Sequence, residues 1–220
     1  MVKMKIEFIV FNLDRVLVEY GAPSCWELID RELHCEEEDK KLNRAFKEGE
    51  FDVRTLSEKT AQLYAKYGLT RQKLDRILRT YVTPMKSASE VLEEAKNRGI
   101  VTGIVSGSLL NFYHFLQEQY GISADKVSIA HSLSFDRKGR LSGGHFTNYD
   151  YEGKFRVIKM FCDELGVSTV QTAFVGNSEN DIYAFRKIGL PIAFNTSNEE
   201  VRKAAAVIEE KDLREVLKYI

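Results

Sequence analysis

Polar side chains follow three apolar, strand-like runs of this 220-residue chain. Asn12 and Asp14 come directly after the first run, Ser106 and Gly107 after the second, and the polar segment 177–181 after a later one. Hydroxyls and free backbone amides at the start of a helix suit an anion, phosphate above all, and carboxylate and amide oxygens suit a divalent cation. The carboxyl ends of parallel strands border one crevice, so we expect these segments to meet there.

The elements that must position these residues alternate along the chain, because short β-branched or aromatic runs are separated by helical patterns. This alternation predicts an α/β fold, a doubly wound parallel sheet with helices on both faces. Strands are expected over 5–11, 101–105, 127–130, 172–175 and 191–194. Helices are expected over 88–98, 109–119, 154–165, 181–187, 199–204 and 212–219.

One stretch, 22–81, interrupts the alternation with charged segments of helical period and no convincing strand. It predicts an inserted helical module with helices over 27–33, 36–47, 53–67 and 71–80. The expected domains are therefore a core formed by 1–21 and 82–220 and a helical cap formed by 22–81. A separate apolar-turn-apolar pattern, 133–141, predicts a β-hairpin.

Composition and charge narrow the classes of partner. The chain has 32 Lys and Arg against 33 Asp and Glu and a net charge of −1, so no diffuse positive field favours nucleic acid or anionic lipid. The first apolar run is too short to span a membrane. Three cysteines without Cys-x-x-Cys spacing favour a reducing cytoplasm. A metal cluster around His34 and Cys35 matches no zinc spacing, and cap packing is the simpler interpretation. Oligomeric state stays open.

The polar segments occur in the order of the four motifs of a known superfamily. With Lys154 opening the helix between the last two, the set resembles the haloacid dehalogenase superfamily of phosphotransferases: Asp-x-Asp-x-(Thr/Val), a Ser or Thr, a Lys, and Gly-Asp-x-x-x-Asp. The nearest resemblance is to its phosphoserine phosphatase branch, over essentially the whole chain, with segments such as 83–84, 105–107 and 211–217 looking like that branch. The resemblance implies a Rossmann-like core with the cap inserted after the first motif.

The resemblance also implies roles for the residues. An aspartate at the position of Asn12 attacks phosphorus, and the match to Asp14 protonates the leaving alkoxide and later activates water. Ser106, the amide of Gly107 and Lys154 hold the phosphoryl oxygens. Mg²⁺ is held by side chain 12, the carbonyl of Asp14 and side chain 177, supported by Asp181. Asn180 lies near the substrate, a small phosphorylated metabolite.

The chain departs from its relatives at Asn12 and Asn177, where the family has aspartates. An amide is a poor nucleophile and forms no acyl phosphate, so a large loss of rate is expected. The four motif carboxylates fall to two, Asp14 and Asp181, which weakens Mg²⁺ binding. Several explanations stay open: position 12 replaced deliberately to trap a substrate, either alone or beside a natural Asn177; a natural pseudo-phosphatase; or an active enzyme with altered metal use.

Substrate recognition is less well specified by the sequence. The branch uses an acidic residue after the first motif to hold an ammonium group, and here Glu19 lies slightly early. No arginine falls clearly where a cap clamp for a carboxylate belongs, since Arg54 is early. His131 is expected to be structural, and the charged run 36–41 a solvated face of the cap. The expected function is an impaired phosphoserine phosphatase-like phosphomonoester hydrolase; the alternative is a non-catalytic protein that binds a phosphorylated ligand or regulates a partner.

Overall fold

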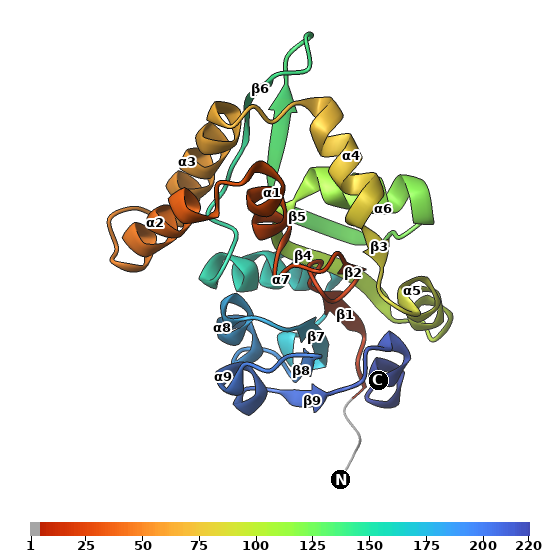
Figure 1. Cartoon of the computed structure of the whole chain (residues 1–220). Coiled ribbons are helices and arrows are strands. Elements are labelled where there is room, and N and C mark those ends of the chain that lie inside the picture. The colour runs from red at the N-terminus through yellow and green to blue at the C-terminus, as the bar shows by residue number, and fades with distance from the viewer. Residues whose placement is uncertain (1–4) are drawn as a thin grey trace.

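A computed structural model describes residues 5–220 and places a seven-stranded sheet at its centre (Figure 1). The strand order is β6-β5-β4-β1-β7-β8-β9, with β6 antiparallel to β5 and all other neighbours parallel. The strands are β1 (Phe8–Phe11), β4 (Val101–Leu109), β5 (Lys126–Phe135), β6 (Leu141–His145), β7 (Thr172–Gly176), β8 (Leu190–Phe194) and β9 (Ala206–Ile208). The short strands β2 (Val18–Glu19) and β3 (Thr83–Pro84) pair separately.

The central strand β1 is apolar throughout because both faces of the sheet are covered. Successive side chains of a strand point to opposite faces. Accordingly Phe8 and Val10 pack in one apolar cluster, whereas Ile9 and Phe11 pack in the other, and all four are fully buried. The sheet therefore separates two cores, and the polar residues that follow β1 lie at its carboxyl edge.

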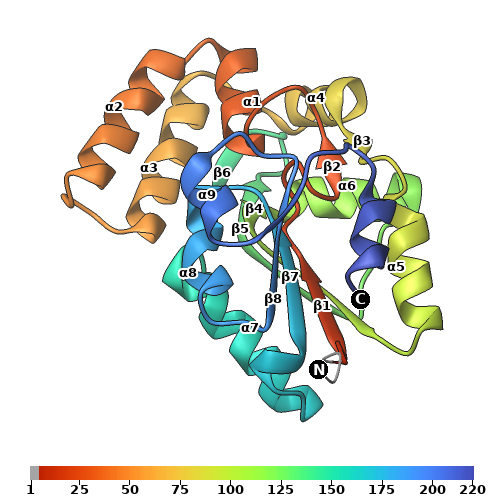
Figure 2. The same cartoon turned by 90° about the horizontal axis from the view of Figure 1, so that it is seen from below.

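Each cluster is completed by helices on one face of the sheet, as the view from below shows (Figure 2). The first face carries α5 (Ala88–Asn97), α6 (Leu110–Tyr120) and the 3₁₀ turn Leu213–Lys218. The second carries α7 (Glu152–Leu165), α8 (Ile182–Phe185) and α9 (Glu199–Lys203). The order of elements places the amino ends of α7 and α8 beside the carboxyl ends of the strands, where the site lies.

Four helices follow β2 and stand over the carboxyl edge of the sheet: α1 (Cys25–Leu33), α2 (Glu36–Lys47), α3 (Val53–Lys66) and α4 (Arg71–Tyr81). Side chains at the N-caps of three of them, Ser24, Asp52 and Thr70, accept bonds from free backbone amides, which explains where these helices begin.

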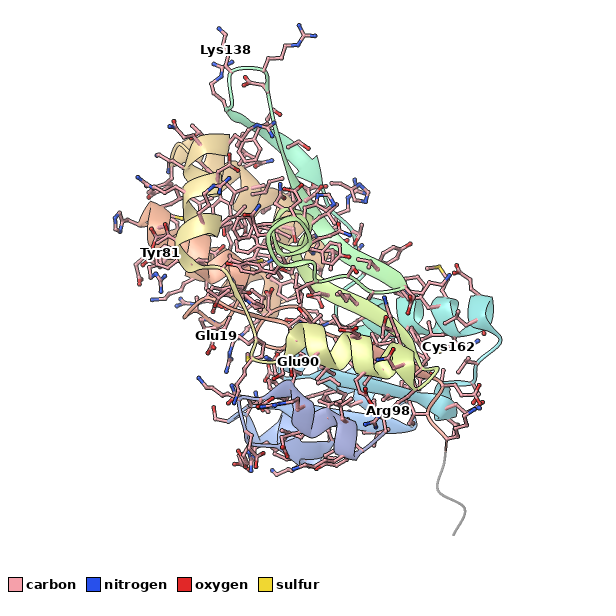
Figure 3. All side chains as sticks on the ribbon, turned by 90° about the vertical axis from the view of Figure 1, so that its right-hand side faces the viewer. Glu19, Tyr81, Glu90, Arg98, Lys138 and Cys162 are labelled. Atoms are coloured by element: carbon pink, nitrogen blue, oxygen red, sulfur yellow. The ribbon has the colours of Figure 1, made fainter. Side chains whose placement is uncertain are left out.

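The long hairpin β5–β6 connects these helices to the core. Its turn, which carries Lys138, projects from the molecule (Figure 3). The amide of Arg71 donates to the carbonyl of Gly139 at 2.8 Å. Farther on, Asn148 accepts from the amide of Arg54 at 2.9 Å and donates to Asp52 at 2.9 Å, so a core residue caps α3. The segment 139–148, which we call the strap, therefore bonds to the start of α4 at one end and to the start of α3 at the other.

The predicted α/β class with a doubly wound, mostly parallel sheet is confirmed. Helices fill the stretch 22–81 as expected, while the division into core and cap domains stays a prediction, and residues 1–4 lie outside the described part. The 133–141 hairpin forms. Some boundaries were wrong: the first strand begins at Phe8, 212–219 forms a 3₁₀ turn rather than an α-helix, and β9 was not expected.

The largest difference is in β4, which continues to Leu109 instead of ending at Val105. Its pairing with β5 is regular up to Ser106, shifts, and resumes at Leu109. The strand thus carries an irregularity at Gly107 and Ser108, and such irregularities turn side chains out of the plane of the ladder. Sequence patterning interpreted these small polar residues as a strand end because they break the apolar run.

Among residues 5–220, no helix has the length and apolar character needed to cross a membrane.

Tight packing of the sheet predicts a test at Gly103. A Cβ on Gly103 would lie 2.8 Å from the ring of Phe8, so Gly103→Ala should lower the free energy of unfolding by about 1–3 kcal/mol through overpacking. Urea denaturation measures this. In a Phe8→Leu background, which removes the ring edge, the cost of the alanine should shrink; an unchanged cost would show that the ring is not the cause.

Candidate active site

A cavity of about 810 Å³ lies between the carboxyl edge of the sheet and helices α1–α3. The predicted residues that line it are Asn12, Asp14, Ser106, Gly107, Asn177 and Asn180. They come from β1, β4 and the β7–α8 turn, which are far apart in sequence, and the parallel sheet brings them together. Two more predicted residues, Lys154 and Asp181, are fully buried beneath it.

Asp14 is the one carboxylate of the first motif, and its environment favours the protonated form. Burial raises its pKa above the usual value, although the nearby hydroxyls of Tyr20 and Ser108, the hydrogen bond from the amide of Cys25 and the charge of Lys154 act in the opposite direction. One of its oxygens, Oδ1, is buried without a partner, and the other accepts from the amide of Cys25 at 3.2 Å. A carboxyl group with a raised pKa holds its proton more readily, which suits the donation of a proton to a leaving group.

The irregular part of β4, residues 106–108, also lines the cavity. Ser106 is buried, and its Oγ accepts from the amide of Ser108 at 3.3 Å. The carbonyl of Gly107 accepts from the indole of Trp26 at 3.2 Å, which ties α1 to this wall. A Cβ at Gly107 would come within 2.2 Å of the carboxylate of Asp150, so a side chain here would require Asp150 to move aside.

The floor of the cavity contains a completely buried ion pair. Lys154 Nζ, from the first turn of α7, lies 2.6 Å from Asp181 Oδ1 and 3.2 Å from Asn180 Oδ1. Burial disfavours the charged lysine, but Asp181 and Asp150 outweigh it and raise the pKa of Lys154. The other oxygen of Asp181 accepts from the amides of Asn177 and Ser178 at 2.8 and 3.0 Å. The pair therefore fixes both the lysine and the β7–α8 turn.

Asp150 is a site residue that sequence analysis missed. Its carboxylate packs on Gly107, accepts from Asn180 Nδ2 at 3.0 Å and lies 3.5 Å from Lys154 Nζ. These are groups expected to hold a phosphate, so a phosphate bound by them must share them with Asp150 or displace it. Nothing in the pattern marks Asp150, because it stands in a loop before α7 and belongs to no motif.

The two amides at the motif positions form a closed network. Asn12 Oδ1 accepts from the amide of Leu13 at 2.9 Å, and Asn177 Nδ2 donates to the carbonyl of Asp14 at 3.1 Å. The remaining amide atoms face each other, with Asn12 Nδ2 3.5 Å from Asn177 Oδ1. Both side chains are buried, 4% and 5% exposed.

Comparison with known proteins agrees with this geometry. The sequence profile of the haloacid dehalogenase-like hydrolases matches residues 13–189. The chain belongs to this hydrolase family. It is 31% identical to a phosphoserine phosphatase of Methanocaldococcus jannaschii over 98% of both chains, and 28% identical to one of Streptomyces coelicolor over 90% of this chain and 46% of that protein.

Solved structures of relatives have the same arrangement. A substrate-bound phosphoserine phosphatase complex superposes with a TM-score of 0.78 at 30% identity, covering 98% of this chain and 99% of that one. A phospho-aspartyl intermediate analogue of phosphoserine phosphatase gives the same values. The likeness supports the phosphoserine phosphatase-like branch of the family for this chain.

The Mg²⁺ that haloacid dehalogenase-like phosphatases generally use does not fit the residues present here. The oxygens of the expected ligands, side chain 12, the Asp14 carbonyl and side chain 177, each accept from or lie near a neighbour in the amide network. Two of the three are neutral amides where Mg²⁺ prefers anionic oxygen. Within residues 5–220, no group of three His, Cys, Asp or Glu side chains could hold a metal.

The wall of the cavity formed by α1 and α2 contains two buried carboxyl groups. Asp30 of α1 and Asp39 of α2 are 2% and 6% exposed and line the cavity. Asp39 accepts from Thr60 at 3.0 Å and from Asn43. Burial and the neighbouring Asp39 raise the pKa of Asp30 to about 8, so one proton is retained at neutral pH. The run 36–41 is mostly exposed, as expected, and Asp39 is the exception because α2 turns this residue toward α1 and α3.

His131 also lines the cavity. It is 2% exposed, its Nε2 lies 3.4 Å from the Ser57 hydroxyl, and its Nδ1 has no partner. Burial lowers its pKa to about 4, so the ring is neutral. The expectation of a structural histidine holds for its packing against Trp26 and Phe146, and its place on the cavity wall was not foreseen.

Glu19, the residue expected to contact substrate, is not brought to this cavity. It lies on β2, on the outer side of the molecule near Tyr81 (Figure 3), and forms an ion pair with Lys211 at 3.2 Å. Arg54 is likewise engaged elsewhere, with Glu58 at 2.9 Å. The basic side chains that do line the cavity are Arg15, Lys40, Arg44 and Lys47.

The buried ion pair predicts a large effect of Lys154→Met. The substitution leaves Asp181 charged, buried and unpaired, and should lower the free energy of unfolding by about 3–5 kcal/mol. Lys159→Met on the same helix breaks an exposed pair with Asp163 and should cost less than about 1 kcal/mol. Guanidinium denaturation compares them. Adding Asp181→Asn to Lys154→Met should recover part of the loss; equal losses for the two lysines would contradict the prediction.

The raised pKa of Asp30 predicts a pH effect. An acid whose pKa is higher in the folded than in the unfolded chain stabilises fully below its ordinary value of 3.8, and this contribution is lost as pH rises through about 8. Asp30→Asn should therefore gain about 1–3 kcal/mol relative to the unmodified chain between these limits. Urea titrations at several pH values measure the difference. Asp75→Asn, exposed on α4, should show no such trend.

Proposed function

We propose that this chain binds the phosphate group of a small phosphorylated metabolite in the cavity and is a phosphoserine phosphatase-like phosphomonoester hydrolase whose aspartyl-phosphate route is impaired by Asn12 and Asn177. One observation carries the proposal: residues at the first, second and fourth motif positions line a single cavity, the lysine of the third is buried beneath it, and an uncharged amide stands at the position of the nucleophile.

The phosphate site is supported by the donors around Gly107. The buried Ser106 hydroxyl and the backbone of the irregular segment come from β4, and Lys154 comes from the start of α7 and lies beneath the same cavity. Charge-assisted bonds from a buried lysine and preorganised donors are the features that hold a phosphoryl group and its transition state.

Impaired hydrolysis follows from the chemistry of position 12. The amide nitrogen of Asn12 has its electron pair delocalised into the carbonyl, and its Oδ1 accepts from the Leu13 amide. Attack on phosphorus by either atom forms no ordinary acyl phosphate. Asp14 retains an environment suited to a proton donor, so the acid is supported while the nucleophile is missing.

The alternative, a non-catalytic protein that binds a phosphorylated ligand or regulates a partner, is favoured by one observation. The amide of Asn12 accepts from the backbone of Leu13, and the amide of Asn177 donates to the backbone of Asp14. These bonds fix both side chains, as a preorganised binding site requires. Both functions use the same cavity and differ in whether carboxylates at positions 12 and 177 restore turnover.

Phosphoserine is the first substrate to test because the relatives carry the name of its phosphatase. The cavity offers both basic side chains on α2 and the Asp30–Asp39 pair for the rest of a ligand. A cytoplasmic location is part of the proposal, supported by Cys25, Cys35 and Cys162, which are free and buried.

Phosphate release from phosphoserine and from an aryl phosphate tests the proposal, with Mg²⁺ present. The unmodified chain, Asn12→Asp, Asn177→Asp and the double variant are compared, and we expect the double variant to exceed the unmodified chain by roughly three orders of magnitude or more. Asn97→Asp, an exposed change of the same charge on α5, is the control and should change nothing.

The outcomes separate the two functions. Turnover by the double variant supports an impaired hydrolase, and a covalent acid-labile phosphate on Asp at position 12 would identify the route. An inert double variant that still binds phosphate supports the binding protein instead. Turnover by the unmodified chain equal to that of the double variant would contradict the impairment.

A further inference from the structure

Resting on the proposed phosphate site, we infer that the paired amides of Asn12 and Asn177 take the place of the divalent cation, so that this site binds its phosphate ligand without metal. The inference concerns how the site is built and holds whether the chain turns over its ligand or only binds it. It depends on the orientation of the two amides, on the charge of the site and on the oxygens that a cation would need.

The orientation of both amides is determined by backbone groups of fixed polarity. The Leu13 N–H can only donate, so the atom of Asn12 that lies 2.9 Å from it is the oxygen. The Asp14 carbonyl can only accept, so the atom of Asn177 that lies 3.1 Å from it is the nitrogen. The two remaining atoms then meet as a donor and an acceptor, 3.5 Å apart. Reversing either amide would break a bond to the backbone.

In this orientation the network covers the expected ligands. The Asp14 carbonyl is bonded to an N–H group, and an N–H group of Asn12 faces the oxygen of Asn177. A cation placed among these oxygens would meet the positive ends of two amide groups and would have to break the bond to the Asp14 carbonyl. Binding to neutral amide oxygens offsets the loss of this hydrogen bond only weakly, because Mg²⁺ prefers anionic oxygen and loses its bound water reluctantly.

The formal charge of the site is consistent with two amides taking the place of two carboxylates and a divalent cation. Replacing the two aspartates of the motif by amides removes two negative charges, which is the charge that one divalent cation would neutralise. When Asp14 and Asp181 are counted as carboxylates in both cases, these two residues and Lys154 carry the same formal charge as a complete motif with its metal. The amides and the absence of metal compensate each other, whereas either change alone would alter the field at the ligand.

The test measures ligand binding and metal binding separately. Binding of inorganic phosphate and phosphoserine is followed by calorimetry in EDTA and in Mg²⁺, for the unmodified chain and for Asn12→Asp/Asn177→Asp. We expect the dissociation constant of the unmodified chain to change less than about twofold between the two conditions, and that of the double variant to be at least about tenfold weaker in EDTA. Mn²⁺ binding, read by electron paramagnetic resonance, should be detected only for the double variant.

Folding is checked by thermal denaturation. The double variant places four carboxylates together, so it should melt lower than the unmodified chain in EDTA and recover in Mg²⁺. Asn97→Asp, an exposed change that adds the charge of one of the two substitutions, is the control and should behave as the unmodified chain in every assay. If the double variant does not fold, the measurements on the unmodified chain alone still decide, because they need no variant.

The outcomes are distinct for the two proposals. Phosphate binding that is equal in EDTA and Mg²⁺, without Mn²⁺ binding, supports the inference. Phosphate binding by the unmodified chain that requires Mg²⁺, or site-bound Mn²⁺ displaced by Mg²⁺, overturns it and leaves the phosphate site intact. Absence of phosphate binding under both conditions overturns the proposed function itself.

Discussion

The buried ion pair between Lys154 and Asp181 is the interaction on which the site depends. It joins the start of α7 to the β7–α8 turn at 2.6 Å, with both side chains fully removed from water. Two charges are stable there only because the second oxygen of Asp181 is satisfied by the amides of the turn, including that of Asn177. The lysine beneath the cavity, the turn that carries the second amide and the start of α7 are thus parts of one arrangement.

Around this pair the chain keeps the fold of its family, but two side chains of the cavity are neutral where the family motif has carboxylates. The proton-donor position, the hydroxyl and glycine of β4 and the buried lysine are all in place. What differs is the pair of neutral side chains that follow β1 and β7: Asn12 accepts from the Leu13 amide, and Asn177 donates to the Asp14 carbonyl, the backbone oxygen expected to bind a cation. The framework depends on apolar packing and on Lys154 with Asp181, so it tolerates the loss of two acids at the cavity surface.

Sequence reasoning identified the sheet, the helical insertion and the convergence of the motifs, because apolar periodicity and strand ends are local signals. It missed features that depend on distant neighbours. The irregularity in β4 arises from pairing with β5, and Asp39 is buried because α1 and α3 pack on α2. Asp150 belongs to no motif and acquires its place only from Gly107 and Asn180. Glu19 was assigned by distance along the chain, but the short strand β2 directs it outward.

The loop between β6 and α7, residues 146–151, links the end of α3 to the cavity wall. Asn148 caps α3, and two residues later Asp150 occupies the donors of the anion site. Tyr151, which follows, has a φ of 49°, a strained value for a residue with a side chain, so this short piece of backbone has little slack. The cap of α3 and the carboxylate on the cavity wall are thus joined by the three residues 148–150, so the position of α3 and the position of Asp150 depend on the same short piece of backbone.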